Sequence, residues 1–262
     1  MPERRISLRV IGIGPGGVKQ VTVQAIEAMS GVDAFLMLDK GTAKQSLLDA
    51  RTAILDAYAP SGYRVVEIAD PPRDRRPADY DAEVRRWHAA RVDAIATVLR
   101  SDVGDGGVAA FLVWGDPALY DSTLRIVEQL AALDDLHLDI EVVPGVTSAS
   151  ALTAAHGIVA HRIGEPVHIT TGRRLPTTPK SVAGNQIVML DGDLAFLTTA
   201  DADDEIWWGA YVGTDDEILI SGRVGDVGEQ IRCARAQARD RIGWIMDIYL
   251  LRKAPGTPTD AE

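Results

Sequence analysis

The chain has 262 residues, of which 46% are hydrophobic and 25% are charged. Such values are ordinary for a folded protein, and a chain of this length can bury a sizeable core, which argues against a mainly disordered state. The 27 Lys and Arg and the 38 Asp and Glu give a formal net charge of −11, which argues against a nucleic-acid partner because phosphate binding depends on basic residues.

The cysteine content and the lengths of the apolar runs limit where the protein can be located and which metal sites it can form. A single cysteine, Cys233, excludes an internal disulfide and a cysteine-rich metal site, so we expect a cytoplasmic protein without a metal. The first apolar run is too short for a signal peptide, and no run of about 20 apolar residues occurs, so no membrane partner is expected. An anionic ligand would have to meet a local cluster of basic residues.

The first half alternates apolar runs with amphipathic segments, which is typical of parallel strands covered by helices. One helix is predicted from Thr22, which suits an N-cap, to Gly31, which suits a C-terminal stop. A longer helix is predicted over residues 80–99, where Val84, Trp87 and Arg91 fall at helical spacing. Strands are predicted near residues 8–12, 34–38, 64–68, 108–114 and 138–143.

The second half changes to strand-like runs joined by short polar turns, with one late helix near residues 227–238. This texture predicts a mixed or largely antiparallel sheet. We therefore expect an α/β protein of two α/β domains, 1–160 and 161–262, with a disordered tail over 254–262. Strands are predicted near residues 167–171, 186–190, 206–212, 218–221 and 244–251.

A glycine-rich turn, GIGPGG at residues 12–17, follows the first strand and fits the spacing GxGxxG. With Asp39 closing the next strand, it is compatible with a dinucleotide site, in which a helix N-terminus holds the pyrophosphate. Two details weaken this interpretation: Pro15 removes an amide donor, and the helix begins only at Thr22. The alternative is a glycine turn that lets the chain reverse.

Two further turns follow strands of the first half. WGDPALYDST, at residues 114–123, combines a permissive Gly115 with Asp116, a hydrogen-bond acceptor. VVPGVTSASALTAA, at residues 142–155, places Thr147 and Ser148 before a helix of small residues, either as helix caps or as hydroxyls that face a ligand. Because carboxyl ends of parallel strands meet at one edge, all three turns are expected to gather where open α/β sheets bind ligands.

In this order, GIGPGG, GDPALY, VPGVTS and a strand-rich second half resemble the tetrapyrrole methylase family over nearly the whole chain. The resemblance implies S-adenosyl-methionine as cofactor, a mainly parallel N-terminal sheet, a mixed C-terminal sheet, a cofactor cleft between the two domains, and a homodimer. WGDPALYDST, an Arg-rich insert, HITTGRRLP and IVMLDGD resemble members that methylate a precorrin in cobalamin synthesis, with C1 methylation of precorrin-5 and loss of an acyl fragment as the expected step.

The resemblance also implies site residues. Trp114 stands where the family usually has Gly, and Leu190, Asp191 and Gly192 stand where it has Tyr-Met-Gly, so backbone contacts are expected there rather than side-chain contacts. The implied cofactor residues are Pro15, Trp114, Gly115, Asp116, Leu119, Thr147, Ser148, Leu190, Asp191, Ile206, Trp207, Gly243, Trp244 and Ile245, and the implied substrate residues are Gly14, Tyr120, Arg173 and Arg174.

Basic residues for the carboxylates of a tetrapyrrole fall into two groups. Arg173 and Arg174, near Arg162 and Lys180, are favoured over the insert because acidic residues interleave the insert. The insert group comprises Arg73, Arg75, Arg76, Arg85 and Arg86. Deacylation needs a base that activates water, and the candidates, none of them assigned, are Asp121, His156, His161 and His168.

Alternative functions stay open from the sequence. Another step of tetrapyrrole methylation would use the same motifs. A nicotinamide oxidoreductase would use the GxGxxG turn and Asp39, and a non-catalytic cofactor-binding module would keep the fold without turnover.

Overall fold

The computed structural model describes residues 5–39, 45–72, 74 and 79–254. Contacts divide the chain into unit 1, residues 1–14 and 18–146, and unit 2, residues 15–17 and 147–262. Each unit contains one five-stranded sheet. The sequence pattern predicts a domain boundary near residue 160, whereas the contacts place the boundary after Val146. The difference arises because helix α5 (Ser148–His156) packs on the sheet of unit 2. The predicted disordered tail lies, apart from Ala254, outside the described residues.

Unit 1 is built on a parallel sheet with the strand order β3-β2-β4-β1-β5. The five predicted strands are confirmed within two residues at either end. Their bounds are β1 (Ile6–Gly12), β2 (Ala34–Asp39), β3 (Arg64–Ala69), β4 (Val108–Val113) and β5 (Leu138–Val143).

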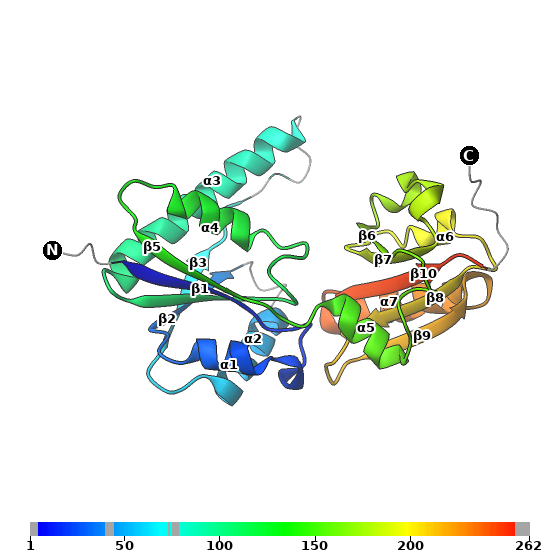
Figure 1. Cartoon of the computed structure of the whole chain (residues 1–262), viewed down its shortest axis with the longest axis horizontal. Helices are drawn as coiled ribbons and strands as arrows, with labels where there is room; N and C mark the ends of the chain where they lie inside the picture. The colour runs from blue at the N-terminus through cyan, green and yellow to red at the C-terminus, as the bar shows by residue number, and fades with distance from the viewer. Residues whose placement is uncertain (1–4, 40–44, 73, 75–78, 255–262) are drawn as a thin grey trace. The chain divides into compact units, whose positions relative to one another are not determined.

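Helices cover both faces of this sheet, with α3 and α4 on one face and α1 and α2 on the other (Figure 1). The Thr22 side chain accepts a hydrogen bond from the Ala25 amide at 3.1 Å, so the predicted cap of the first helix is confirmed. The sequence analysis did not identify α2. The bounds are α1 (Val23–Met29), α2 (Gln45–Tyr58), α3 (Tyr80–Val98) and α4 (Thr123–Ala131), with the 3-10 turn η1 (Val18–Gln20) and the π-helical turn η3 (Leu99–Val103).

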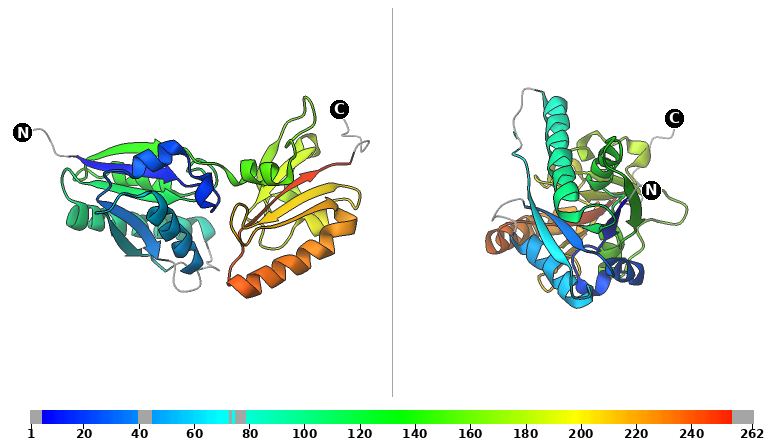
Figure 2. Two further views of the ribbon diagram at one scale, coloured as in Figure 1. Left: turned by 90° about the horizontal axis from the view of Figure 1, so that it is seen from below. Right: turned by 90° about the vertical axis from the view of Figure 1, so that its left-hand side faces the viewer.

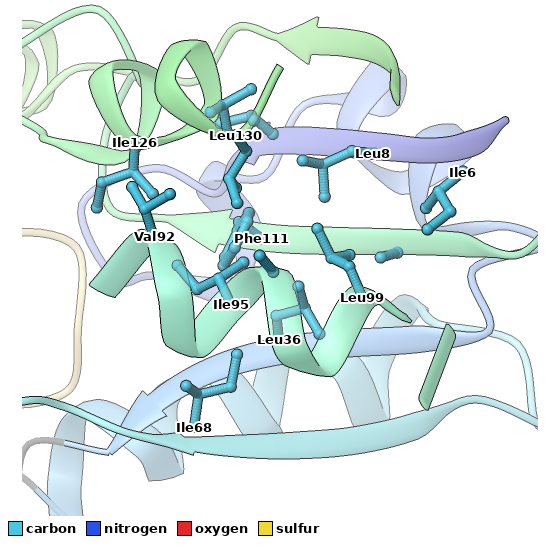
Figure 3. Packing of buried hydrophobic residues seen from close by; sticks show 14 of the residues in the cluster. Ile6, Leu8, Leu36, Ile68, Val92, Ile95, Leu99, Phe111, Ile126 and Leu130 are labelled. Atoms are coloured by element: carbon cyan, nitrogen blue, oxygen red, sulfur yellow. The ribbon is translucent and has the colours of Figure 1, made fainter. Parts of the chain in front are cut away.

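The core of unit 1 forms because its inner strands β2, β4 and β1 carry buried apolar residues on both faces. Toward α3 and α4, Leu8, Leu36 and Phe111 of the sheet pack against Ile95 and Ile126 (Figure 3). A second cluster fills the opposite face, against α1 and α2. Each such side chain contributes about 1.5 to 3 kcal/mol on full burial, so this packing fixes the strand ends that carry the glycine turns.

Unit 2 contains a mixed sheet with the order β6-β7-β10-β8-β9. Strands β6 and β7 are parallel, and the remaining neighbours are antiparallel, which confirms the predicted mixed character. The last strand begins at Asp247 rather than near Trp244, because residues 243–246 form the connection from α7. The bounds are β6 (His168–Thr171), β7 (Asn185–Met189), β8 (Glu205–Ala210), β9 (Ile218–Arg223) and β10 (Asp247–Arg252).

Helices α5 and α7 lie on opposite faces of the second sheet (Figure 2, left; α5 green, α7 orange). The small residues Ala149 and Ala151 of α5 pack in one cluster with Leu250 of β10. Among the described residues, no helix is long and apolar enough to cross a membrane. The remaining bounds are α6 (Phe196–Thr199), α7 (Val224–Ile242), η4 (Leu175–Thr177) and η5 (Lys180–Val182).

A partly buried ion-pair cluster connects the end of β10 to the start of β8. Lys253 Nζ lies 2.7 Å from Oδ2 of Asp204, which is fully buried, and 3.0 Å from Oδ2 of Asp201. Burial alone would lower the pKa of Lys253, but hydrogen bonds and charge from both aspartates outweigh it and raise the pKa above 10.5. The pair therefore stabilises unit 2 at neutral pH.

We expect Lys253→Met to lower the free energy of unfolding by about 1.5 to 3 kcal/mol, because a charged hydrogen bond is lost and a buried carboxylate remains. The raised pKa sets the sign of the pH dependence. The difference from wild type is full below pH 10.5 and shrinks as the pH rises through the raised pKa. Urea unfolding of both proteins at neutral and alkaline pH measures this, and equal stability at neutral pH would contradict it.

Candidate functional site

The three glycine turns that follow β1, β4 and β5 meet at the carboxyl ends of these strands. Strands β4, β1 and β5 are neighbours, so the turns at their carboxyl ends lie side by side. The Gly14 amide donates to the Gly115 carbonyl at 3.2 Å, and the Gly115 amide donates to the Gly14 carbonyl at 2.8 Å. The predicted gathering of these turns is confirmed.

Glycine is required in these turns because the backbones touch. A Cβ atom at Gly145 would lie 2.1 Å from the Gly115 carbonyl oxygen, and one at Gly12 would lie 2.6 Å from the Gly145 nitrogen. Neither position has the positive φ that often explains a glycine, so close approach is the reason for both.

Asp116 joins two of the turns through its carboxylate. Oδ2 accepts a hydrogen bond from the Gly145 amide at 3.0 Å, and Oδ1 accepts one from the Ala118 amide at 2.8 Å. Both contacts are to backbone, so the side chain holds the turn after β4 against the turn after β5. Contact of Asp116 and of the following Leu119 with a cofactor stays a prediction.

Trp114 packs inside unit 1 beside a buried cation. The Arg51 guanidinium carbon lies 5.2 Å from the centre of the Trp114 ring, and Arg51 Nε donates to the Leu112 carbonyl at 3.1 Å. Burial lowers the pKa of Arg51 to about 10, with the nearby Asp121 acting in the opposite direction. Within the described part of the chain, the buried Trp114 Nε1 has no hydrogen-bond partner.

The hydroxyl pair that follows the VPG turn begins α5. Thr147 Oγ1 accepts from the Ser150 amide at 3.1 Å and lies 2.9 Å from the Ser150 hydroxyl oxygen. Thr147 is thus the N-cap of α5, which confirms the capping interpretation. Ser148, the first residue of the helix, keeps an intermediate exposure.

In unit 2, the segments with the favoured arginines and with Leu190 follow neighbouring strands. Strands β6 and β7 are parallel and end in register, with Thr171 opposite Met189. Gly172 follows β6, its amide donates to the Met189 carbonyl at 3.1 Å, and Arg173 and Arg174 come next, both exposed. The unit 2 edge, as we name this end of the sheet, therefore carries the predicted substrate arginines and the predicted cofactor turn.

Backbone strain is concentrated at these segments. Among the described residues, the non-glycine residues with positive φ are Tyr120, Leu190, Leu194 and Tyr211, with φ between 50° and 55°. Tyr120 lies in the GDPALY turn of unit 1, and the others lie at or near the unit 2 edge. Such conformations cost about 1 to 3 kcal/mol each and persist where surrounding structure enforces them, which is frequent at functional sites.

Tyr211 is a site candidate that the sequence analysis missed. Its hydroxyl donates to the Trp244 carbonyl at 2.5 Å, and the two rings meet edge to face at 5.4 Å. The interaction holds Trp244 and Ile245, both predicted cofactor residues, at the start of β10. Gly243 ends α7 in a left-handed conformation just before them. The sequence signal was an aromatic residue two positions before Gly213.

Two predicted cofactor residues lie away from this edge. Ile206 is fully buried in the core, opposite Leu251 and near the start of β8. Trp207 lies opposite Leu250, which pairs with Ile187, so it is offset from Leu190 by three residues, or roughly 10 Å along the sheet. The structure does not bring these two residues together with the turn after β7.

The candidate bases hydrogen-bond to nearby backbone. Asp121 Oδ1 accepts from the Thr123 amide at 2.6 Å, and ring nitrogens of His156 and His161 lie 3.1 Å and 2.9 Å from the carbonyl oxygens of Trp208 and Arg162. His168 begins β6, at the end of the strand remote from Arg173. Within the described ranges, no group of His, Cys, Asp and Glu could hold a metal ion.

The insert group of arginines is only partly described. Arg86 pairs with Glu83 at 2.7 Å, and Arg73, Arg75 and Arg76 lie outside the described residues, as does the side chain of Lys180. Cys233 is exposed on α7. The buried Arg91 pairs with Asp70 at 2.5 Å and stacks on Trp87, which ties α3 to the end of β3.

Comparison with known proteins decides the family. Residues 7–228 match the family model described as Tetrapyrrole (Corrin/Porphyrin) Methylases.

The chain belongs to this tetrapyrrole methylase family.

A curated relative from Sinorhizobium sp, named precorrin-6A synthase (deacetylating), is 46% identical over 245 residues, or 93% of this chain and 94% of the relative. A solved structure from Corynebacterium diphtheriae, described as cobalamin synthesis related (CobF), has a TM-score of 0.84 at 44% identity and covers 95% of this chain and 99% of its own. A uroporphyrin-III C-methyl transferase from Thermus thermophilus, solved with S-adenyl homocysteine, shares the fold, with a TM-score of 0.58 at 16% identity. The match covers 95% of this chain and 92% of that structure's chain.

Two features of the methylase fold remove the basis of the dinucleotide interpretation. Strand β1 lies between β4 and β5, whereas the usual dinucleotide-binding order places it between the second and fourth strands. The first α-helix begins at Val23, after a separate 3-10 turn, so its positive end does not follow the glycines. Asp39 closes β2, as predicted.

The turns of this methylase suit a sulfonium cofactor chemically. GIGPGG, WGDPALYDST and PGVTS contain carbonyl groups and, in the second turn, two aspartates, but no lysine or arginine. The Arg51 guanidinium reaches Trp114 from α2, where it donates to the Leu112 carbonyl and lies near Asp121. A positively charged sulfur is favoured beside carbonyl dipoles and carboxylates and disfavoured beside a cation. The residues present therefore fit S-adenosyl-methionine.

Proposed function

We propose that this tetrapyrrole methylase is an S-adenosyl-methionine-dependent C-methyltransferase of cobalamin synthesis. The proposed reaction methylates C1 of precorrin-5 and removes its acyl fragment to give precorrin-6A. One observation carries the proposal: the 46% identity to a precorrin-6A synthase (deacetylating) extends over 93% of this chain and 94% of the relative.

In the proposed reaction, the main task of the protein is to align the methyl donor with the ring carbon that accepts the methyl group. S-adenosyl-methionine supplies an electrophilic methyl group on a sulfonium, and the methyl moves to a ring carbon by in-line displacement. Holding two reactants in line can supply about 7 to 11 kcal/mol of the barrier, so no covalent nucleophile on the protein is needed. Turns that are held tightly by backbone contacts, like those around Gly14, Gly115 and Gly145, support such a role.

Substrate recognition is assigned to the arginines of the unit 2 edge. A precorrin carries several carboxylates, whereas the chain has a net charge of −11, so the cations must be local. Arg173 and Arg174 are both exposed and follow a strand end, and the planar guanidinium fork matches a carboxylate. The assignment of Gly14 and Tyr120 to the substrate is part of the same proposal.

Loss of the acyl fragment requires water and a base. Water adds to the acyl carbonyl, the carbon–carbon bond to the ring breaks, acetate leaves, and the electron pair on the ring carbon takes the methyl group. We assign the base to no residue, because the contacts of Asp121, His156 and His161 are to backbone.

Turnover tests the proposal directly. The purified protein is incubated with precorrin-5 and S-adenosyl-methionine, and mass spectrometry follows the tetrapyrrole while separate assays follow acetate and S-adenosyl-homocysteine. We expect one added methyl group, one lost acetyl group and equal amounts of the two small products. Methylation of a different precorrin without acetate release would indicate another step of the family.

Calorimetry separates the alternatives of a different class. Titrations with S-adenosyl-homocysteine and with NAD are run side by side on the same preparation. We expect binding of the first and none of the second. Binding of NAD alone would favour an oxidoreductase, and binding of S-adenosyl-homocysteine without turnover of any precorrin would favour a non-catalytic module.

The proposal includes the location and assembly of the protein. We place it in the cytoplasm, where a single cysteine stays reduced, and we propose a homodimer, the commonest symmetric assembly. Light scattering on a size-exclusion column measures the mass in solution, and a monomer of 28.2 kDa would contradict the dimer.

A further inference from the structure

The turn that follows β7 combines exposure with strain. Leu190 is 67% exposed although it is a large apolar residue, and its φ of 53° lies in the left-handed region. The next residue, Asp191, is only 5% exposed. A conformation of this kind is kept only if the neighbouring structure enforces it.

The carboxylate of Asp191 is the first part of that enforcement. Its Oδ2 accepts hydrogen bonds from the Tyr249 hydroxyl at 2.7 Å and from the Ala195 amide at 2.8 Å. Its Oδ1 accepts from the Asp193 amide at 3.2 Å. A Cβ atom at Gly172 would lie 2.4 Å from this carboxylate, so the turn after β6 packs directly on it.

The second part is the guanidinium of Arg235, which reaches the same turn from α7. It donates to the Asp191 carbonyl at 2.9 Å and to the Gly192 carbonyl at 3.3 Å. Its Nε donates at 2.8 Å to Asp247 Oδ2, which also accepts from Trp208 Nε1 at 3.1 Å. The fork therefore links α7, β8 and β10 to two successive carbonyls next to Leu190.

The protonation states keep these donors in place. Burial, together with Asp191, raises the pKa of Tyr249 far above its ordinary value, so its hydroxyl keeps the proton that it donates. Burial also raises the pKa of Asp247, and the charge of Arg235 opposes that rise. Both Tyr249 and Asp247 come from one short strand, β10.

We infer that Tyr249 and Arg235 are positioning residues that hold the Leu190 backbone in the conformation that binds the cofactor. The inference rests on the proposed function and on the backbone contact with S-adenosyl-methionine that the family resemblance implies for this turn. Buried polar groups cost folding free energy unless every one of them is hydrogen-bonded, so apolar residues would fill this part of the core at a lower cost. The presence of Tyr249 and Arg235 therefore calls for a reason other than packing. Here Arg235 contacts the backbone beside Leu190 directly, and Tyr249 supports it through the Asp191 carboxylate.

The test uses the full chain and S-adenosyl-homocysteine as the probe. Tyr249→Phe removes only the hydroxyl and keeps the ring that packs edge to face on Phe196 at 5.1 Å. Arg235→Lys keeps a cation opposite Asp247 but loses the fork to the two carbonyls. The matched control is Lys253→Met, which breaks a buried contact at the opposite end of the same sheet.

We expect Tyr249→Phe to weaken binding of S-adenosyl-homocysteine about tenfold by calorimetry, the effect of one hydrogen bond to a carboxylate. Arg235→Lys should weaken it at least as much. Hydrogen exchange of the segment 186–196 should become faster in both, without ligand. Lys253→Met should leave affinity and exchange of this segment unchanged while lowering the urea midpoint.

Two results would overturn the inference. One is wild-type affinity in Tyr249→Phe and Arg235→Lys, and the other is an equal loss of affinity in Lys253→Met, which would reflect general destabilisation. A wild-type protein that binds no S-adenosyl-homocysteine would instead contradict the proposed function, and the inference with it. The two failures are therefore distinguishable in one set of titrations.

Discussion

Gly145→Ala is expected to lower the rate of methyl transfer about 100-fold, the typical effect of an ångström-scale misplacement of reacting groups. The added Cβ atom would lie 2.1 Å from the Gly115 carbonyl oxygen and 2.8 Å from the Gly12 carbonyl carbon. Both neighbours are backbone, so a rotamer change cannot relieve the clash and the turns must separate. We also expect the free energy of unfolding to fall by about 1 to 3 kcal/mol.

Gly184→Ala is the matched control for this substitution. Gly184 precedes β7, has no positive φ, and a Cβ atom there would meet only a carboxylate oxygen of Glu165 at 3.9 Å. Rates with precorrin-5 and urea unfolding are measured for both variants. Wild-type turnover by Gly145→Ala would show that the contact of the three turns is not needed for the reaction.

The double variant Arg173→Ala, Arg174→Ala is expected to weaken tetrapyrrole binding about 100-fold and to leave affinity for S-adenosyl-homocysteine unchanged. A hydrogen bond to a charged group is worth about 1.5 to 3 kcal/mol, so each arginine accounts for roughly a factor of ten. Both side chains are exposed at the unit 2 edge, so their loss leaves the core intact.

A second double variant serves as the control for the change in net charge. Arg232→Ala with Arg239→Ala removes the same two positive charges from exposed positions on α7. Fluorescence titration with the tetrapyrrole and calorimetry with S-adenosyl-homocysteine are run on both double variants. An equal loss of tetrapyrrole affinity in the two would mean that the chain attracts the substrate by overall charge rather than through the unit 2 edge.

Most of the secondary structure was predictable because its signals are local. Apolar runs bounded by glycine identify β1 and β4, and Thr22 marks the start of α1 through its own side chain. The convergence of the three turns was also predictable, since parallel strands end at the same edge. Helix α2 was missed.

The order of strands within each sheet was not predictable from local patterns. Pairing of β1 with β4 and β5 depends on contacts between segments far apart in the chain. For the same reason, Ile206 and Trp207 could not be placed relative to Leu190, because the register of β8 against β10 decides which end of the strand they occupy. The cofactor contacts that the family resemblance implies for Ile206 and Trp207 stay a prediction, and the structure places these residues away from the turn after β7.

The contact of Arg235 with the Leu190 turn could not be predicted from the sequence, for a physical reason. In EQIRCARAQAR, Arg232, Arg235 and Arg239 look equivalent, and charged residues on a helix usually face water. The spacing of Ile231 and Ala238 gave a signal, since it places Arg235 on the same buried face of α7. A cation on an apolar helix face must be paired, and here its partners are Asp247 and two carbonyls.

The position of β1 between β4 and β5 has a consequence for biosynthesis of the chain. Ser7 of β1 pairs with Val108 of β4 and with Asp139 of β5, so this early segment leaves the ribosome long before either neighbour exists. Such high contact order slows folding, and an apolar strand with open edges is prone to aggregate while it waits. Nascent chains that stall before β5 should therefore depend on chaperones, whereas chains stalled just beyond it should not.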